Sequence, residues 1–141
     1  MASNADVIDV YWKACWNGRE VNRLGEVFHD PYTHGRTQFS PTLMAGIMEE
    51  AWRQFPDFQV QVNERQVLDD AVITRATFIG THGGQIFGLS PTGGTVELPT
   101  LDVFFFRGGK VWLYWHLTDH LPIIQGIGAE VRVGEQLATW D

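Results

Sequence analysis

The stretch from Thr95 to Thr118, which reads TVELPTLDVFFFRGGKVWLYWHLT, decides the fold of this chain. Its two halves, Thr95 to about Phe106 and Val111 to Thr118, are rich in the β-branched and aromatic residues that favour strands. Between them, Arg107-Gly108-Gly109-Lys110 supplies the glycines that a tight hairpin turn needs. The stretch therefore predicts two long antiparallel strands joined by a hairpin.

A second hairpin is expected before the first one. Phe58 to Val62 alternates between apolar and polar residues, with the period of two that a half-buried strand has. Asp69-Asp70 is a turn, and Ala71 to His82 predicts a second long strand. The connection from Gly83 to Gly94 is rich in Gly, Pro, Ser and Thr, which predicts a loop.

Helices are expected before the strands. Apolar residues from Val7 to Cys15 recur at helical spacing and stop at Gly18, and a second short helix is expected at about 20–28. A short extended piece follows at 31–36. Ser40 then has the position of an N-cap, with Pro41 at the first helical position, and Pro56 ends this third helix. The residues expected on its buried stripe are Leu43, Ile47, Met48, Ala51 and Phe55.

The order of elements predicts an α+β fold. We expect a curved antiparallel sheet wrapped around the N-terminal helices, as a cone-shaped α+β barrel with an internal pocket. Residues 121–127 predict a short last helix, and the pattern of the tail to Asp141 is ambiguous. The 141 residues are expected to form a single domain, 1–141.

Composition excludes several function classes. Six Trp and nine Phe in 141 residues favour an apolar ligand cavity. The net charge of −7, without a basic run, argues against nucleic acid as a partner. No apolar stretch approaches the ~20 residues of a membrane span, and no secretory pattern precedes Asp9, so a cytoplasmic protein is expected. The single cysteine, Cys15, is expected to be a buried, inert thiol.

Asp119 is the sharpest candidate for chemistry. It ends an aromatic strand directly before the apolar segment 121–127. Apolar neighbours penalise the charged form of a carboxyl group, which suits a general acid/base that works near neutral pH. The same position suits an N-cap of the helix that follows, and the two roles are compatible. If Asp119 caps that helix in solvent, another acid/base must take its place.

Three histidines come from three separate segments and can point into one cavity: His34, His82 and His116. The alternative for each is a hydrogen-bonded structural role. His116 and His120 stand four apart, but that spacing serves a metal site on a helix and not at the end of a strand, so no metal is expected.

Other residues are expected to bind the substrate. Asp102 lies in the middle of a strand, where an acidic residue either pairs with a neighbour or belongs to a pocket wall. The residues expected to contact substrate are Trp115, Tyr114, Asp102, Phe87, Phe104 and Trp16. Further rings expected to shape the cavity are Trp12, Phe78 and Phe106.

The run from Gly80 to Gly93, GTHGGQIFGLSPTG, resembles the signature of the SnoaL-like ester (polyketide) cyclase family. In that family a Gly-Thr-His-x-Gly stretch is followed by Gly-x-x-Pro-Thr-Gly. Four more stretches agree with the family in order and spacing: Phe55 to Phe58, Leu101 to Phe104, Gly108 to Val111 and Trp115 to Asp119. The resemblance covers about residues 7–128.

The resemblance implies a fold like that of nuclear transport factor 2 and ketosteroid isomerase, with a pocket inside the cone. Open sheets of this fold often pair back to back, which implies a homodimer. Enzymes of the family, in secondary metabolism, close a ring of a polyketide methyl ester by intramolecular aldol condensation. Their general acid/base is the last Asp of the closing motif, here Asp119, and His34 and His82 have the positions of pocket-lining histidines.

Two residues depart from the family pattern. His116 replaces the first Asp of the closing motif, and Tyr114 replaces the His that often precedes the Trp. Both changes alter the hydrogen bonding of the pocket, so the substrate class stays open.

The sequence therefore predicts a cofactor-independent cyclase of a polyketide-like or other small apolar or aromatic carbonyl substrate. In this hypothesis Asp119 removes an acidic α-proton, the enolate attacks a carbonyl of the same molecule, and the acid or a histidine protonates the alkoxide. One alternative is another enzyme on this fold: a dehydratase, isomerase, hydroxylase or epoxide hydrolase. An epoxide hydrolase would need an Asp-Arg-Asp relay such as Arg75 with Asp102 and Asp119. A second alternative is a non-catalytic ligand-binding domain.

Overall fold

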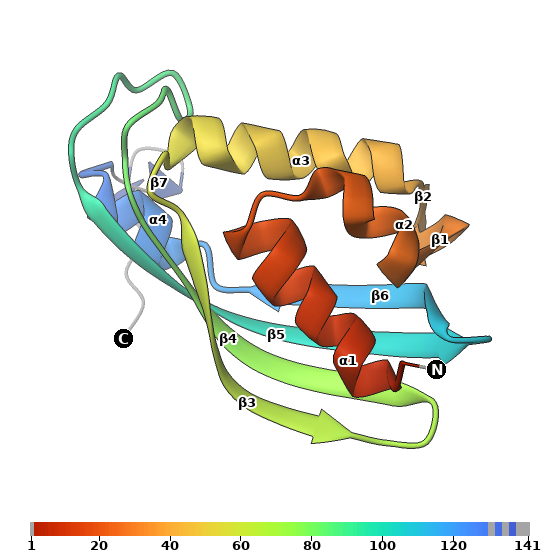
Figure 1. The fold of residues 1–141 in the computed structure, drawn as a ribbon. Coiled ribbons are helices and arrows are strands. Elements are labelled where there is room, and N and C mark those ends of the chain that lie inside the picture. The colour runs from red at the N-terminus through yellow and green to blue at the C-terminus, as the bar shows by residue number, and fades with distance from the viewer. Residues whose placement is uncertain (1, 130–131, 134–135, 138–141) are drawn as a thin grey trace.

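The computed structural model describes residues 2–129, 132–133 and 136–137, and its main feature is one strongly curved sheet (Figure 1). The sheet has six strands in the order β2-β1-β6-β5-β4-β3 and does not close into a barrel. The strands are β1 (Phe28–His34), β2 (Thr37–Phe39), β3 (Gln59–Val67), β4 (Ala71–Thr81), β5 (Thr95–Arg107) and β6 (Lys110–Thr118). β1 runs parallel to β6, and the other neighbours are antiparallel. The fold is therefore the predicted mixed α+β arrangement, with a sheet that stays open.

Both predicted hairpins are present. Arg107 pairs with Lys110, and the two glycines between them have φ of +60° and +82°. This left-handed backbone is the one that a two-residue turn requires and that glycine adopts without strain. β3 and β4 pair antiparallel around the turn at 69–70. Beyond the sheet, β7 (Arg132–Val133) pairs with β8 (Gln136–Leu137).

The N-terminal helix is longer than expected and changes its winding. α1 (Asn4–Asp9) continues directly into the π-helix η1 (Val10–Asn17). At its end, Asn17 donates through Nδ2 to the Val60 carbonyl (2.9 Å) and accepts from the Val60 N–H (2.8 Å). The side chain therefore extends the hydrogen bonding of β3 and fixes the helix against the sheet. The second expected helix is shorter than 20–28, because it consists of η2 (Val21–Arg23) and α2 (Leu24–Val27) and Phe28 already belongs to β1.

α3 (Pro41–Gln54) has the predicted start, since Ser40 Oγ accepts from the Leu43 N–H (3.1 Å). Its predicted buried stripe is wrong in part. Met44, Met48 and Trp52 are buried, whereas Leu43 and Ile47 are 49% and 43% exposed. The buried side of the helix is the one that carries Trp52, whose ring packs against that of Trp16. The last helix, α4 (Leu121–Gly126), lies where it was expected.

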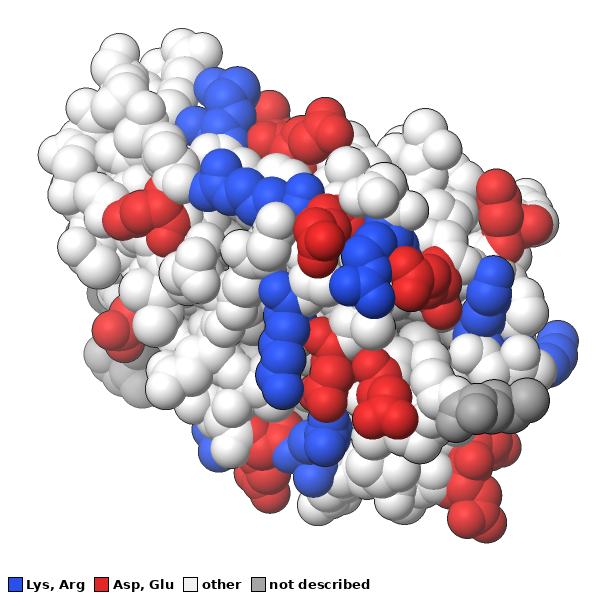
Figure 2. Space-filling model, viewed as in Figure 1, with Lys and Arg blue, Asp and Glu red and all other residues white. Residues whose placement is uncertain are grey.

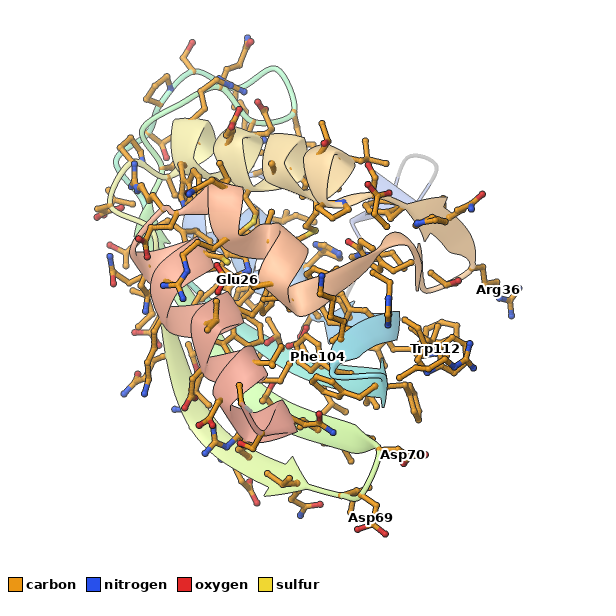
Figure 3. The ribbon with its side chains drawn as sticks, turned by 45° about the vertical axis from the view of Figure 1, so that its right-hand side comes forward. Glu26, Arg36, Asp69, Asp70, Phe104 and Trp112 are labelled. Carbon is orange, nitrogen blue, oxygen red and sulfur yellow. The ribbon has the colours of Figure 1, made fainter. Side chains whose placement is uncertain are left out.

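The core lies on the concave side of the sheet, which the helices cover (Figure 1). Tyr11 is at its centre, with ring centroids 4.6–5.8 Å from those of Trp12, Phe28, Phe104 and Tyr114. Figure 3 shows Phe104 in this interior, between the helices and the sheet. The helices thus leave the convex face of the sheet uncovered.

Charged side chains of both signs are mixed over the face in Figure 2, and no patch of one sign dominates it. Several form ion pairs, such as Arg65 with Asp9 (2.7 Å) and Arg23 with Glu26 (2.8 Å). None of the described helices is long and apolar enough to cross a membrane.

Candidate functional site

A cavity of about 220 Å³ lies between the concave face of the sheet and the helices. Apolar and aromatic side chains form most of its wall. Four rings with a hydroxyl group or an imidazole nitrogen also line it, those of Tyr11, His34, Tyr114 and His116. The residues that line it are Tyr11, Trp16, His34, Met44, Ile47, Ala51, Gln54, Phe55, Phe58, Phe78, Leu98, Tyr114, His116 and Ile123. An apolar pocket with a few convergent polar groups is the usual form of a small-molecule site.

Asp102 on β5 organises the polar side of this cavity. Its carboxylate is fully buried and accepts hydrogen bonds from Thr100 Oγ1 (2.8 Å), from the Tyr114 hydroxyl and from His116 Nδ1 (2.6 Å). A buried carboxylate is costly unless several donors satisfy it, and these three do so. Of the two alternatives for Asp102, pairing with neighbours or a place in the pocket wall, the structure shows the first: its partners hold it directly behind the cavity wall.

His116 on β6 lies opposite Asp102 in the sheet and reaches the cavity. Because the carboxylate oxygen is an acceptor, Nδ1 of the imidazole carries the proton. Whenever the ring is neutral, Nε2 is the nitrogen without a proton, and its lone pair is available to a ligand. A histidine whose tautomer and orientation are fixed by a buried carboxylate has the arrangement of a general base.

Two tyrosines extend this network. The Tyr114 hydroxyl donates to Asp102, so it accepts from the Tyr11 hydroxyl (3.3 Å). Burial, and then the negative charge of Asp102, raise the pKa of both hydroxyls well above the usual range. Both tyrosines therefore stay neutral; Tyr114 holds the carboxylate, and Tyr11 holds the Tyr114 hydroxyl.

His34 on β1, the strand next to β6, continues the polar wall beside Tyr114. Its ring lies 4.9 Å from the Tyr114 ring, and its Nδ1 is buried without a hydrogen-bond partner among the described residues. Burial, and then the proximity of His116, lower its pKa. His34 is therefore a neutral imidazole that can exchange a hydrogen bond with a ligand.

His82 lies elsewhere, at the base of the loop between β4 and β5. Its Nδ1 accepts from the Thr92 N–H (3.2 Å), and its ring is buried. It does not belong to the cavity lining, and its contacts are those of the structural role.

Asp119 also lies outside the cavity lining. It is exposed after the end of β6, and its Oδ1 accepts from the Leu121 N–H (3.0 Å) at the start of α4. The predicted N-cap role of Asp119 is wrong, because the N-cap of α4 is His120 and its side chain forms no capping hydrogen bond. The contact of Asp119 with the N–H two residues further on is that of an Asx turn before the helix.

The expected substrate-binding residues divide in the same way. Trp16 and Tyr114 line the cavity, and Phe104 lies fully buried behind it, stacked on Tyr114 at 4.5 Å. Trp115 is on the convex face and 38% exposed, and Phe87 is 77% exposed in the loop between β4 and β5.

The arginine of the epoxide hydrolase alternative also faces outward. Arg75 is exposed and forms an ion pair with Glu64 (3.2 Å). No Asp-Arg-Asp relay is formed by Arg75, Asp102 and Asp119, because the Arg75 side chain points away from the cavity.

Sequence reasoning missed Tyr11 and Thr100, two members of the network around Asp102. Thr100 precedes Asp102 by two residues on one strand, so the two side chains share a face. The spacing of two within a predicted strand could therefore have identified Thr100 from the sequence. Tyr11 gave no comparable signal, because its hydroxyl sits on an otherwise apolar helix stripe.

Comparisons with known proteins agree with this architecture. Residues 6–127 match the SnoaL-like polyketide cyclase family. No curated protein sequence matches the chain. A SnoaL-like polyketide cyclase from Agrobacterium tumefaciens is 18% identical with a TM-score of 0.78, and the match covers 91% of this chain and 100% of that one.

Two Streptomyces proteins are similar as well. IdmH from Streptomyces antibioticus, provisionally named a polyketide cyclase, has a TM-score of 0.81 at 21% identity, over 91% of this chain and 100% of that one. AclR from Streptomyces galilaeus, provisionally named a hydroxylase, has a TM-score of 0.78 at 24% identity, over 89% and 95%. At such identities these structures show the shared fold, whereas the family match spans most of the chain. The chain therefore belongs to the family of SnoaL-like polyketide cyclases.

Proposed function

We propose that this protein closes a ring in a small carbonyl compound by an intramolecular aldol reaction, with His116 as the general acid/base. The observation that carries the proposal is the contact between His116 Nδ1 and the buried Asp102 (2.6 Å) at the wall of an apolar cavity. Membership of the cyclase family supports the reaction class.

The proposed reaction begins with His116 Nε2, which removes an acidic proton from the carbon between two carbonyl groups. Asp102 stabilises the imidazolium ion that forms. The enolate carbon then forms a bond to a ketone carbon of the same molecule, and the electron pair of that carbonyl moves to its oxygen. The imidazolium returns the proton to this alkoxide, so that the protein ends in its starting state. The apolar wall holds the two ends together, which lowers the entropic part of the barrier.

This proposal moves the acid/base from Asp119 to His116. The family resemblance implies Asp119, but that carboxylate is exposed and engaged with the Leu121 N–H. His116 stands where the family has the first Asp of its closing motif, and Asp102 supplies the carboxylate across the hairpin. We propose His34 as the neutral group that orients a carbonyl of the substrate.

The test uses a methyl β-keto ester whose central carbon, between the two carbonyl groups, carries a saturated chain of four methylenes that ends in a second ketone. Attack of the central carbon on this ketone closes a six-membered ring. We expect the wild-type protein to accelerate ring closure, measured by NMR, and His116→Gln and Asp102→Asn to lower the rate by roughly 10²–10⁴-fold. Asp119→Asn is the matched control and should retain most of the rate.

Loss of ring closure in Asp119→Asn, with retention in His116→Gln, would return the role to Asp119. If the wild-type protein binds the keto ester and releases it unchanged, the ligand-binding alternative holds instead. Circular dichroism of each variant separates a lost catalytic group from a lost fold.

We also propose that the protein is a homodimer that pairs through the convex face of its sheet. Leu101 and Leu117 are directly opposite each other on β5 and β6, and they are 45% and 60% exposed. Trp115 adds a large apolar side chain to the same face. A contiguous exposed apolar surface of this kind is typical of a protein–protein interface.

A further inference from the structure

The cavity lies between two packed layers of the fold. Side chains of β1, β4, β5 and β6 line it on one side, those of η1 and α3 line it on the other, and α4 adds Ile123. Because packed secondary structure yields little, the cavity cannot widen without loss of contacts in its walls. Its volume therefore limits the size of a ligand that lies inside it.

That volume is small. It is about 220 Å³, below the roughly 300–1,000 Å³ of pockets that enclose a drug-sized ligand. A dry apolar cavity of about 150 Å³ holds benzene. The cavity therefore has room for one ring with its substituents or for two fused rings, and it is too small for three.

The register of the sheet sets the polar end of the cavity apart from its apolar end. His116 pairs with Asp102 on β5, and Phe78 on β4 pairs with Leu98 on β5. Asp102 and Leu98 are four residues apart, which is about 13 Å at the rise of about 3.3 Å per residue of a strand. A ligand with its carbonyl groups at His116 therefore has its apolar part toward Phe78 and Leu98.

Phe78 nevertheless reaches toward the polar end. Its ring lies 5.9 Å from the His116 ring, with the two planes 21° apart. The Phe78 side chain is 9% exposed, and its ring packs against those of Phe58 (5.1 Å between centroids) and Trp16 (5.5 Å). A group bound at His116 Nε2 must therefore fit beside a Phe78 ring that its neighbours hold in place.

Little free space remains beyond Phe78 and Leu98. The next inward pair of the two strands is Gly80 with Val96, and the gap that these four residues help to line has a volume of about 20 Å³. A space of this size holds one water molecule or one methyl group. None of the described residues in its lining has a polar side chain, so a methyl group suits it better than water. The Phe78 side chain thus stands between the cavity and any extension of it along the sheet.

We propose that Phe78 determines the size of the substrate, by restricting the cavity to β-dicarbonyl compounds whose ring closure gives one or two rings. The substrate class is then a compact, enolisable dicarbonyl compound, and polycyclic compounds of three or more fused rings are excluded. This inference rests on the proposed function, because it places the carbonyl groups at His116.

The test compares three cyclic β-diketones with the same polar head: cyclopentanedione, its benzene-fused form indanedione, and its naphthalene-fused form. Dissociation constants come from isothermal titration calorimetry, so the test needs no turnover. We expect the wild-type protein to bind indanedione more tightly than cyclopentanedione, because the added ring buries apolar surface. The naphthalene-fused compound overfills the cavity and should bind roughly ten- to a hundredfold more weakly than indanedione.

Phe78→Ala removes the ring that limits the cavity, so it should bind the naphthalene-fused compound roughly ten- to a hundredfold more tightly than the wild type does. The matched control is Phe106→Ala, because Phe106 is a similarly buried ring on β5 (7% exposed) outside the cavity lining. This control should keep the wild-type order of the three compounds. If circular dichroism shows that Phe78→Ala does not fold, Phe78→Leu decides the test with Phe106→Leu as its control, and the same change should be smaller. The proposal fails if the wild type binds the naphthalene-fused compound as tightly as indanedione, or if a folded Phe78 variant gives that compound no gain.

Quinoline and acridine separate this inference from the proposed function, since they have two and three fused rings and no carbonyl group. If none of the diketones binds the wild type, the proposed head group is wrong, and these two compounds alone then test the size limit. Tighter binding of quinoline than of acridine to the wild type and to Phe106→Ala, with a gain for acridine in Phe78→Ala, supports it. Absence of that gain, or of binding to all three proteins, overturns it.

Discussion

At the scale of single residues, the site depends on a charge placed where water does not reach it. Asp102 is fully buried, and three donors from Thr100, Tyr114 and His116 hold its oxygens. If one donor were removed, part of the cost of burying the carboxylate would no longer be offset. Such an arrangement contributes little net stability and instead fixes one orientation of His116.

His34 makes the stability of the protein depend on pH. Its pKa is lowered below 6.5 in the folded protein by burial and by His116, so the unfolded chain binds the proton more readily. The stabilisation is complete above pH 6.5 and is lost as the pH falls through the folded-state pKa. We expect His34→Leu to flatten the decline of the melting temperature between about pH 7 and about pH 5.

Replacement of the exposed His120 by Gln is the control for loss of a histidine as such. If the melting temperature declines with pH in His34→Leu as it does in the wild type, but declines less in the control, the pH dependence does not come from His34.

At the scale of elements, the Gly-Thr-His-Gly-Gly run joins the loop between β4 and β5 to the end of α3. The N–H groups of Gly83 and Gly84 donate to the Gln54 carbonyl (2.9 and 3.1 Å) and thereby satisfy the C-terminus of the helix. His82 closes the base of the loop through its backbone bonds with Gly93 and Gly94. The motif therefore fixes where α3, and with it the mouth of the cavity, lies against the sheet.

Gly84→Ala tests this junction. An added Cβ would lie 2.1 Å from the Arg53 carbonyl oxygen, which belongs to the backbone and cannot rotate away. We expect a loss of about 1–3 kcal/mol in the free energy of unfolding, measured by urea denaturation. Gly25→Ala has free space and a helical position, so it should be neutral or stabilising by up to about 1 kcal/mol. Equal effects of the two changes would contradict the close approach.

The sequence predicted both hairpins and α3, but not the pairing of Asp102 with His116. Counted back from the turn at Gly108-Gly109, Asp102 would face Trp115. β6 carries one extra residue at Trp112, between the pairs Phe106–Val111 and Phe105–Leu113, and this bulge moves the register by one. Periodicity cannot locate a bulge, and a shift of one residue exchanges the two faces of a strand.

The same bulge determines which residues of β6 face the interior and which face outward. Val111, Tyr114 and His116 face the interior, whereas Trp115 and Leu117 face outward. Figure 3 shows Trp112 at the edge of the molecule, away from the interior that holds Phe104. The choice of Trp115 as a substrate contact therefore depended on a register that the sequence does not reveal.

At the scale of the whole molecule, the curved sheet has two faces with different uses. The concave face is covered by helices and holds the cavity, and none of the described helices covers the convex face (Figure 1). The convex face carries apolar cross-strand pairs, Leu101 with Leu117 and Val103 with Trp115. Large apolar side chains on an open sheet invite association, and a second copy of the same face is the simplest partner for them.

Leu117→Glu tests this association. Leu117 is 60% exposed and close to the centre of the apolar pairs, so a buried, unpaired carboxylate there should convert the dimer to a monomer. Leu68→Glu is the matched control, because Leu68 is 54% exposed but lies beside the turn between β3 and β4. Light scattering after size-exclusion chromatography should give twice the chain mass for the wild type and for Leu68→Glu, and the chain mass for Leu117→Glu. A monomeric wild-type protein, or a dimeric Leu117→Glu variant, would show that the convex face is not the interface.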